Sequence, residues 1–319
     1  MKPEEGETGV KERLIDDYGR EIRSLRFSLT SRCTLNCIYC HREGDNRAAQ
    51  KREKEISSER VIAIARVASA QFGVRKIKIT GGEPLMRTDL AEIVQGMRAF
   101  EDDISVTTNG VFLQKYAADL ADAGLDRVNV SLDSLKAERY DFITRSKNNL
   151  SRVIEGIDSA IDAGLTPIKL NMVVLKGVND DELVDMMRFV SDCNKRGDGN
   201  VVILQPIELI PAFNSPLQQY KADFNKLEEE LKSKASAIKT RRLQRRKKYI
   251  VDGVEVEVVH PIDNTEFCAN CSRLRITSDG MLKACLLRDD NLVPVERADD
   301  EYIRNQLMVA MKRREPFFR

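Results

Sequence analysis

The chain has 319 residues, 42% of them hydrophobic and 32% charged, and its 52 Lys and Arg nearly balance 51 Asp and Glu. This length suits one large α/β domain with a smaller addition, or two domains. The near-zero net charge gives no sign of a nucleic-acid or membrane partner, and two histidines are too few for a multi-histidine zinc enzyme or a typical Ser–His–Asp hydrolase. The first residues are polar and no segment reaches membrane-spanning length, so we expect a cytoplasmic protein.

Residues 25–29 (LRFSL) predict the first strand, and Cys33, Cys37 and Cys40 follow it closely. Seven cysteines in a cytoplasmic chain favour metal or redox chemistry over disulfides. Three thiolates at this spacing suit a soft metal centre, and a [4Fe–4S] cluster held by three cysteines keeps one iron open. The alternative is a zinc ion bound by the three cysteines and His41.

Strand and helix patterns then alternate. Short β-rich runs occupy 75–80, 104–109, 127–133, 167–174 and 201–209, and amphipathic segments occupy 57–73, 89–100, 113–124, 150–164 and 180–197. Several of these segments open on Ser, Asp or Asn and close on Gly, which are helix-capping residues. About six repeats of this unit predict a parallel sheet with right-handed crossovers, as in a partial or full β/α barrel.

Three further motifs follow the predicted strands: TGGEP at 80–84, TTNG at 107–110 and SLDS at 131–134. Each alone is ordinary turn material. In β/α barrels, however, the carboxyl ends of the strands meet on one rim, where active sites lie. Together with the cysteine trio, the motifs indicate a site on that rim.

After about residue 215 the pattern changes, so we expect a barrel core over 1–215 and an extension over 216–319. Residues 221–238 predict a charged helix, and 249–260 predict a hairpin that turns at Asp252-Gly253. The cationic run 240–248 (TRRLQRRKK) has the composition of a phosphate contact, but without interleaved aromatic residues it favours a solvated loop. A second trio follows, Cys268, Cys271 and Cys285, for which a zinc knuckle completed by His260 or an acid is the alternative. Cys193 lies in a helical segment and is expected in the core.

The first trio, spaced C-x3-C-x2-C with Tyr39 before its last cysteine and a GGEP stretch downstream, resembles the radical S-adenosylmethionine superfamily. The resemblance implies a partial β/α barrel in which S-adenosylmethionine chelates the open iron of the first [4Fe–4S] cluster. Cleavage of its sulfonium then gives a 5′-deoxyadenosyl radical. It also implies S-adenosylmethionine contacts at Tyr39, Gly82 and Ser131.

The second trio, C-x2-C-x13-C with SRLR after its second cysteine, is similar to the molybdenum cofactor biosynthesis protein A family, the GTP 3′,8-cyclases. This similarity runs from about residue 17 to about 288. It implies an α+β extension whose second [4Fe–4S] cluster holds the guanine of GTP. It also implies GTP contacts at matched positions, namely Arg26, Lys78, Thr107, Lys169, Arg273 and Arg275. Lys78 stands where bacterial members have an arginine, which keeps the charge and loses the planar fork.

The resemblance implies an enzyme that converts GTP to (8S)-3′,8-cyclo-7,8-dihydro-GTP, the first step of molybdenum cofactor biosynthesis, with release of 5′-deoxyadenosine and methionine. It also implies an external electron donor, a homodimer, and transfer of the product to cyclic pyranopterin monophosphate synthase. The alternatives are a radical enzyme that modifies peptides and uses an auxiliary cluster, and a non-catalytic iron–sulfur or zinc scaffold.

Many members of the family end in a Gly-Gly tail that reaches the active site, whereas this sequence ends in REPFFR. We expect Phe317 and Phe318 to dock the terminal helix on the barrel, because aromatic side chains dominate such packing. The alternative is that Arg319 reaches the site.

Overall fold

The computed structural model describes residues 12–44, 55–196, 201–211, 215–261 and 264–316. The strands are β1 Ser24–Ser28, β2 Lys76–Thr80, β3 Asp103–Thr108, β4 Arg127–Ser131, β5 Ile168–Val174, β6 Val202–Glu208, β7 Ala237–Thr240, β8 Lys247–Val251, β9 Val254–Glu257, β10 Arg273–Ile276, β11 Met281–Lys283 and β12 Val293–Pro294. The α-helices are α1 Ser58–Phe72, α2 Leu90–Arg98, α3 Leu113–Asp122, α4 Ala137–Thr144, α5 Leu150–Asp162, α6 Leu183–Asn194, α7 Phe224–Lys234, α8 Thr265–Ala269 and α9 Asp300–Lys312.

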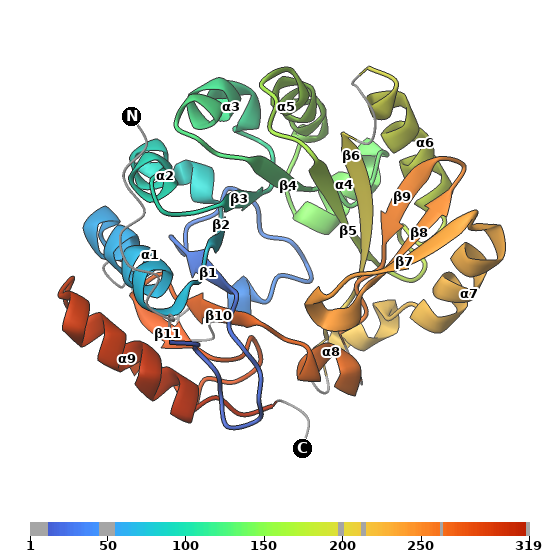
Figure 1. The fold of residues 1–319 in the computed structure, drawn as a ribbon. Coiled ribbons are helices and arrows are strands. Elements are labelled where there is room, and N and C mark those ends of the chain that lie inside the picture. The colour runs from blue at the N-terminus through green and yellow to red at the C-terminus, as the bar shows by residue number, and fades with distance from the viewer. Residues whose placement is uncertain (1–11, 45–54, 197–200, 212–214, 262–263, 317–319) are drawn as a thin grey trace.

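Within the described residues, one 12-stranded sheet runs in the order β12-β11-β10-β1-β2-β3-β4-β5-β6-β9-β8-β7. Strands β1 to β6 are parallel neighbours in chain order, with helices along their outer side (Figure 1). The two ends of this order, β12 and β7, are not paired with each other, so the sheet is an open, partial barrel. This confirms the predicted fold class and all six predicted strands of the first two thirds.

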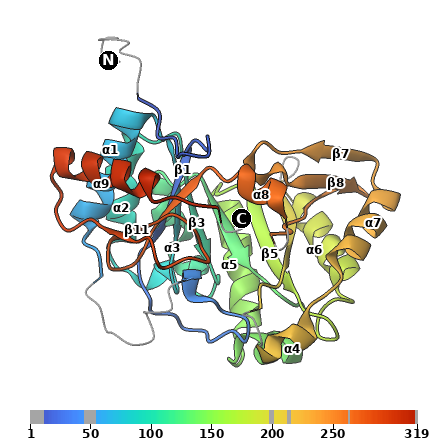
Figure 2. The same ribbon diagram turned by 90° about the horizontal axis from the view of Figure 1, so that it is seen from below.

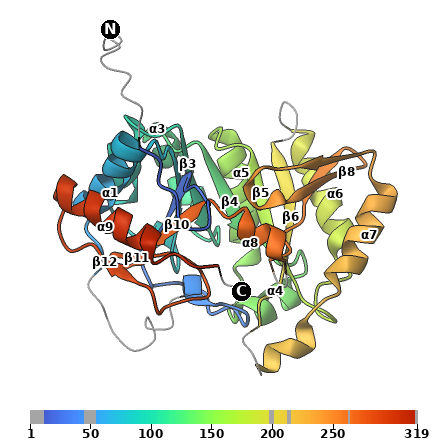
Figure 3. The same cartoon turned by 60° about the horizontal axis from the view of Figure 1, so that its bottom comes forward.

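The last third of the chain supplies both edges of the sheet. β10 pairs in parallel with β1, and β9 pairs in parallel with β6. In Figure 2 the two edges stand on opposite sides of the molecule, with β11 near α9 and β7 near α7. Helix α9 packs against α1, so elements from the two ends of the chain lie side by side (Figures 1 and 3). The expected boundary near residue 215 stays a prediction.

Helix α1 begins and ends where capping residues stand in the sequence. Ser57 accepts a hydrogen bond from the backbone N–H of Arg60 at the start of α1. Gly73 ends this helix at φ 67°, a left-handed conformation that costs glycine least. The amphipathic pattern therefore located the helix to within one residue at each end.

Alternation along the strands separates an apolar face from a polar one. Leu25 and Phe27 of β1, with Ile77 and Ile79 of β2, are buried in the core under the outer helices. The residues between them, Arg26 and Lys78, are register partners and share the opposite face, which is the barrel interior. The outer face stabilises the fold by apolar burial, while the interior carries charge.

Two predictions for the last third need correction. The predicted helix over 221–238 ends at Lys234, and Ala237–Thr240 form β7, which pairs with β8. The 240–248 run is not a solvated loop, because Gln244 is buried and Arg246 is bound to a carboxylate. The hairpin that turns at Asp252-Gly253 is confirmed as β8 and β9. Helix α4 had no counterpart among the predicted elements.

Cys193 is 1% exposed within α6, which confirms its place in the core. No described helix combines the length and the apolar character needed to cross a bilayer. Phe317, Phe318 and Arg319 lie outside the described residues, so the prediction about the tail stays open.

Glu101, in the connection between α2 and β3, is 2% exposed, and neither of its carboxylate oxygens has a hydrogen-bond partner among the described residues. Burial raises its pKa to about 8. A raised pKa gives stability that is present below the ordinary value and lost as the pH rises through the folded-state value. The stability of the protein should therefore fall between about pH 4.5 and pH 8 because this group ionises.

We expect Glu101→Gln to remove this loss of stability with rising pH. Its free energy of unfolding should exceed that of the wild type by about 1–3 kcal/mol at pH 8.5, because the amide has no charge that burial disfavours, and by little at pH 5. Thermal unfolding of anaerobically purified protein at the two pH values measures this, with Glu92→Gln on the exposed face of α2 as the control. An equal gain at both pH values would contradict the ionisation argument.

Candidate active site

The first cysteine trio lies beyond the carboxyl end of β1. Backbone N–H groups point at two of its sulfurs, since Leu35 N is 3.4 Å from Cys33 Sγ and Arg42 N is 3.4 Å from Cys40 Sγ. The side-chain amide of Asn109 is 3.7 Å from Cys33 Sγ. Three neighbouring thiols, two of which receive N–H hydrogen bonds, are a donor set that fits an iron–sulfur cluster. In the described part of the chain, no three His, Cys, Asp or Glu side chains surround a position for one metal ion.

The GGEP stretch packs against the backbone segment that precedes Cys33. Gly82 N donates to Thr30 O at 2.7 Å, and a Cβ on Gly82 would come within 2.2 Å of Arg32 O. Glu83 is fully buried and accepts from the Thr108 hydroxyl and the Asn109 backbone N–H, both at 2.7 Å. Burial raises the pKa of Glu83 to about 7. The glycines are therefore needed for packing against the segment that leads to Cys33, and Glu83 positions the Asn109 that contacts its sulfur.

Tyr39 is held by the SLDS motif. Its hydroxyl donates to Asp133 Oδ2 at 2.6 Å, and Asp133 Oδ1 accepts from Val173 N at 2.8 Å. Burial raises the pKa of Asp133 to about 6. This contact ties the loop between Cys37 and Cys40 to the carboxyl ends of β4 and β5.

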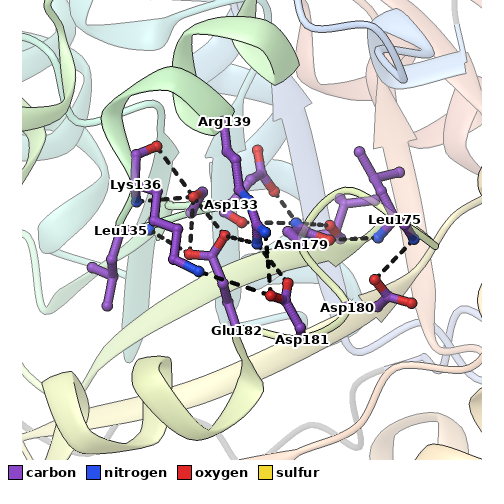
Figure 4. A network of polar contacts seen from close by, with 12 residues as sticks. Asp133, Leu135, Lys136, Arg139, Leu175, Asn179, Asp180, Asp181 and Glu182 are labelled. Atoms are coloured by element: carbon purple, nitrogen blue, oxygen red, sulfur yellow. Dashed lines mark hydrogen bonds and ion pairs between the residues drawn. The ribbon is translucent and has the colours of Figure 1, made fainter.

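A network around Asp133 fixes that rim (Figure 4). Asn179 donates to the Asp133 carbonyl at 2.7 Å and accepts from Leu175 N at 2.7 Å. Glu182 is fully buried, accepts from the Ser134 hydroxyl and the Leu135 N–H, and pairs with Arg139 at 2.8 Å. Asn179 and Glu182 both bind residues of the loop after β4, so the network fixes the position of Asp133 and hence of Tyr39.

The structure therefore brings the S-adenosylmethionine positions together on one rim. Tyr39 and Gly82 adjoin the trio, and Ser131 ends β4 beside Asn171 of β5. The prediction that TGGEP, TTNG and SLDS share an edge with the cysteines is confirmed by the parallel order of β1 to β4. Their ligand contacts stay predictions.

The predicted GTP positions form a second region inside the barrel. Register pairs Arg26 with Arg275 on one side and with Lys78 on the other. Further along, Asn129 is the partner of both Thr107 and Lys169, and its amide lies 3.3 Å from the Thr107 hydroxyl. Like charges opposite each other destabilise a sheet unless an anion joins them. Burial and the neighbouring Arg273 lower the pKa of Lys78 well below its usual value.

A cavity of about 820 Å³ lies at the amino-terminal ends of the strands. Of the six predicted GTP positions, Lys78 and Lys169 line it, together with further cations and Cys271 of the second trio. Arg26 and Arg275 lie outside this lining. Sequence reasoning placed the chemistry at the carboxyl ends of the strands. The structure shows that only the first trio and its motifs lie there, whereas the cationic cavity faces the other mouth of the barrel.

One carboxylate, Glu43, organises two of the predicted GTP contacts. It accepts from Arg26 Nη2 at 2.6 Å and Arg26 Nε at 3.0 Å, and from Arg275 Nη1 at 2.9 Å. Burial opposes its ionisation, but the two guanidinium groups hold its pKa far below the ordinary value. Glu43 stands three residues after Cys40, so this contact joins the first trio's loop to β1 and β10.

A second carboxylate, Glu257, organises cations that sequence reasoning missed. It is fully buried and pairs with Lys169, with Arg241 at 2.9 Å and with Arg246 at 3.4 Å. Arg241 and Arg246 line the cavity and come from the run interpreted as a solvated loop. The signal that could have found them is the strand alternation of VEVE, which places Glu257 on the polar face of β9.

The second trio lies at the cavity mouth. Cys271 N donates to Cys268 O at 3.1 Å, and Cys285 lies two residues beyond β11. Burial raises the pKa of the Cys271 thiol, yet Arg314 and Arg273 outweigh this effect and lower it. Arg273 is 6% exposed, and its Nε has no hydrogen-bond partner among the described residues. A thiol with a lowered pKa beside an unpaired guanidinium suits a site for a metal centre and an anion.

Residues 27–190 match the model of the radical SAM superfamily, and residues 204–318 match the model described as Molybdenum Cofactor Synthesis C. With the partial barrel and the trio on its rim, this defines a radical S-adenosylmethionine enzyme, which works with a [4Fe–4S] cluster. Proteins named probable GTP 3′,8-cyclase from Methanosarcina acetivorans and Methanocella arvoryzae are 50% and 49% identical to the chain. The alignments cover 100% and 96% of this chain, and 93% and 95% of those relatives. The chain belongs to the GTP 3′,8-cyclase family.

Solved structures are similar in fold. Streptococcus suis SuiB bound to S-adenosylmethionine matches with a TM-score of 0.60 at 17% identity, over 83% of this chain and 60% of SuiB. The protein anSMEcpe with bound AdoMet matches with a TM-score of 0.61 at 15% identity, over 89% of this chain and 79% of that chain. These likenesses establish the architecture of the open barrel.

Proposed function

We propose that the enzyme converts GTP to (8S)-3′,8-cyclo-7,8-dihydro-GTP and releases 5′-deoxyadenosine and methionine. The observation that carries this proposal is the cationic cavity inside a radical S-adenosylmethionine barrel. A triphosphate is a polyanion that arginine and lysine bind well, and the cavity lining offers both in Lys78, Lys169 and Arg241. A peptide substrate has no comparable need for so many buried cations.

The first trio would hold the cluster that supplies the electron for cleavage of S-adenosylmethionine. Tyr39, Gly82 and Ser131 are proposed to bind and orient S-adenosylmethionine on the same rim. The barrel interior separates this rim from the cationic mouth, and the surrounding strands keep the reacting groups away from water and free thiols.

At the other mouth, Cys268, Cys271 and Cys285 are proposed to hold a second [4Fe–4S] cluster with one open iron for the guanine. Six residues are proposed to bind GTP: Arg26, Lys78, Thr107, Lys169, Arg273 and Arg275. An external electron donor, a homodimer and a downstream synthase that takes the product complete the proposal.

The decisive experiment is an anaerobic turnover of the reconstituted enzyme with GTP, S-adenosylmethionine and a chemical reductant. The proposal predicts 5′-deoxyadenosine and a cyclised nucleotide in equal amounts. Formation of 5′-deoxyadenosine that does not depend on GTP, with no new nucleotide, would overturn the assignment of the substrate. About eight irons per chain would support two clusters, whereas zinc would support a scaffold.

The unpaired guanidinium of Arg273 gives a prediction for binding. Arg273→Ala should weaken GTP binding by about 1.5–3 kcal/mol, the value of a hydrogen bond to a charged group, and Arg275→Ala should act in the same direction. Anaerobic calorimetry with GTP and with S-adenosylmethionine measures this, and Arg297→Ala, on an exposed side chain, is the control. Equal loss of both ligands would mark a folding defect rather than a lost contact.

A further inference from the structure

Arg314 lies two residues beyond the end of α9 and is the largest fully buried side chain among the described residues, at 1% exposure. Its Nη2 donates to the carbonyl oxygen of Cys271 at 2.6 Å. Its Nη1 donates to Asp16 Oδ2 at 2.8 Å and to the carbonyl of Arg20 at 3.3 Å. One side chain near the end of the sequence therefore joins the N-terminal segment to the loop of the second trio.

Asp16 completes a triad with Arg20. Its Oδ2 also accepts from Arg20 Nε at 2.7 Å, and its Oδ1 accepts from the backbone N–H groups of Arg20 and Tyr18 at 2.8 and 3.1 Å. Arg20 Nη1 lies 3.5 Å from the carbonyl oxygen of Cys268. Two guanidinium groups thus hold the backbone carbonyls of two cysteines, and a single carboxylate balances them.

The triad of Asp16, Arg20 and Arg314 has an excess positive charge and unpaired N–H donors. Two positive charges share one negative charge away from solvent, which is costly unless a further anion lies nearby. Arg20 Nη2 and Arg314 Nε are buried and have no hydrogen-bond partner among the described residues. Such donors are rarely left unpaired in a folded protein, so they point to a negatively charged group absent from the chain itself.

We propose that Arg314 and Arg20 are positioning residues of the second cluster, which they retain in the chain and whose reduction potential they raise. The inference rests on the proposed second cluster. Positive charge and N–H donors beside cluster sulfurs favour the more negative, reduced state and so raise the potential. Asp16 acts in the opposite direction, because its carboxylate offsets one of the two cations.

The experiment uses a background in which Cys33, Cys37 and Cys40 are all alanine, so that only the second trio can hold a cluster. After anaerobic reconstitution, iron per chain, retention of iron under a chelator, and the midpoint potential from an EPR-monitored titration are measured. Arg314→Gln should lose iron several-fold faster and shift the potential to a more negative value. Arg314→Lys should lie between this variant and the parent, and Lys312→Gln, on the exposed face of α9, should match the parent.

Two further variants keep the test decisive. Arg20→Gln preserves the Asp16–Arg314 pair and should also shift the potential to a more negative value, which serves if Arg314→Gln does not fold. Asp16→Asn should shift it to a more positive value, a change of sign that a purely structural triad would not produce. Folded variants with unchanged potential and iron retention would overturn the proposal. No iron in the parent background would instead refute the second cluster itself.

Discussion

We expect Cys37→Ala to abolish reductive cleavage of S-adenosylmethionine, and Cys271→Ala to leave some uncoupled cleavage while it abolishes the cyclised nucleotide. The difference follows from where the two trios lie. Cys37 is on the rim with Tyr39 and Ser131, whereas Cys271 lines the cationic cavity at the other mouth of the barrel. Loss of one thiolate leaves only two cysteines at either site, because the one described cysteine outside the trios, Cys193, is buried in α6.

Anaerobic single-turnover assays for 5′-deoxyadenosine and for the nucleotide product measure the two activities in each variant. Cys193→Ala is the matched control, because this thiol is buried in α6 away from both trios and its loss should leave both products. A Cys271→Ala enzyme that still formed the cyclised nucleotide at the wild-type rate would show that the second trio is not part of the substrate site.

Of the substitutions proposed for this protein, Glu257→Gln should lower the free energy of unfolding most. Its carboxylate is fully buried among Lys169, Arg241 and Arg246, so the amide would leave buried cations without a counter-ion. Removing one partner of such a group costs about 3–5 kcal/mol, less the contribution of Arg241, whose side chain is 37% exposed. The pKa of Glu257 lies below its ordinary value, so this stability is present at neutral pH and is lost as the pH falls below about 4.5.

The same variant tests the cavity as a polyanion site. If the triphosphate binds beside Lys169, GTP should raise the melting temperature of Glu257→Gln more than that of the wild type, because it supplies the missing negative charge. Differential scanning fluorimetry with and without GTP measures both effects, and Glu229→Gln on the exposed face of α7 is the control. A variant destabilised equally with and without GTP would place the nucleotide away from this group.

Most of the barrel could be predicted from the sequence, because local patterns such as helix caps and strand alternation mark the βα units. Ser57 and Gly73 mark the ends of α1, and the alternation of Arg26 with Leu25 and Phe27 marks a strand with one apolar face. The motifs TGGEP, TTNG and SLDS could be placed on one rim because parallel strands end on the same side.

The carboxylates at the centre of the site could not be predicted, because their role depends on residues far away in the chain. Glu43 matters only because β10 brings Arg275 beside Arg26, and Glu257 only because β9 pairs with β6 near Lys169. The run 240–248 was misread for the same reason, since its composition is that of a solvated segment until Glu257 is placed next to it. Arg314 likewise reads as one cation among several in a charged tail.

The pairing of β1 with β10 has a consequence for synthesis on the ribosome. β1 emerges early, yet the neighbour that covers one of its edges, Arg273–Ile276, emerges only when most of the chain has been made. Until then the nascent chain exposes an unpaired strand edge, the kind of surface that promotes aggregation. Cys268, Cys271 and Cys285 flank this late strand, so the second trio is complete only after β10 and β11 have emerged. A metal centre that needs all three of these cysteines, as proposed above, therefore assembles only after β10 and β11 have been made, and a chain cut short before β10 lacks both the covering strand and the proposed ligands.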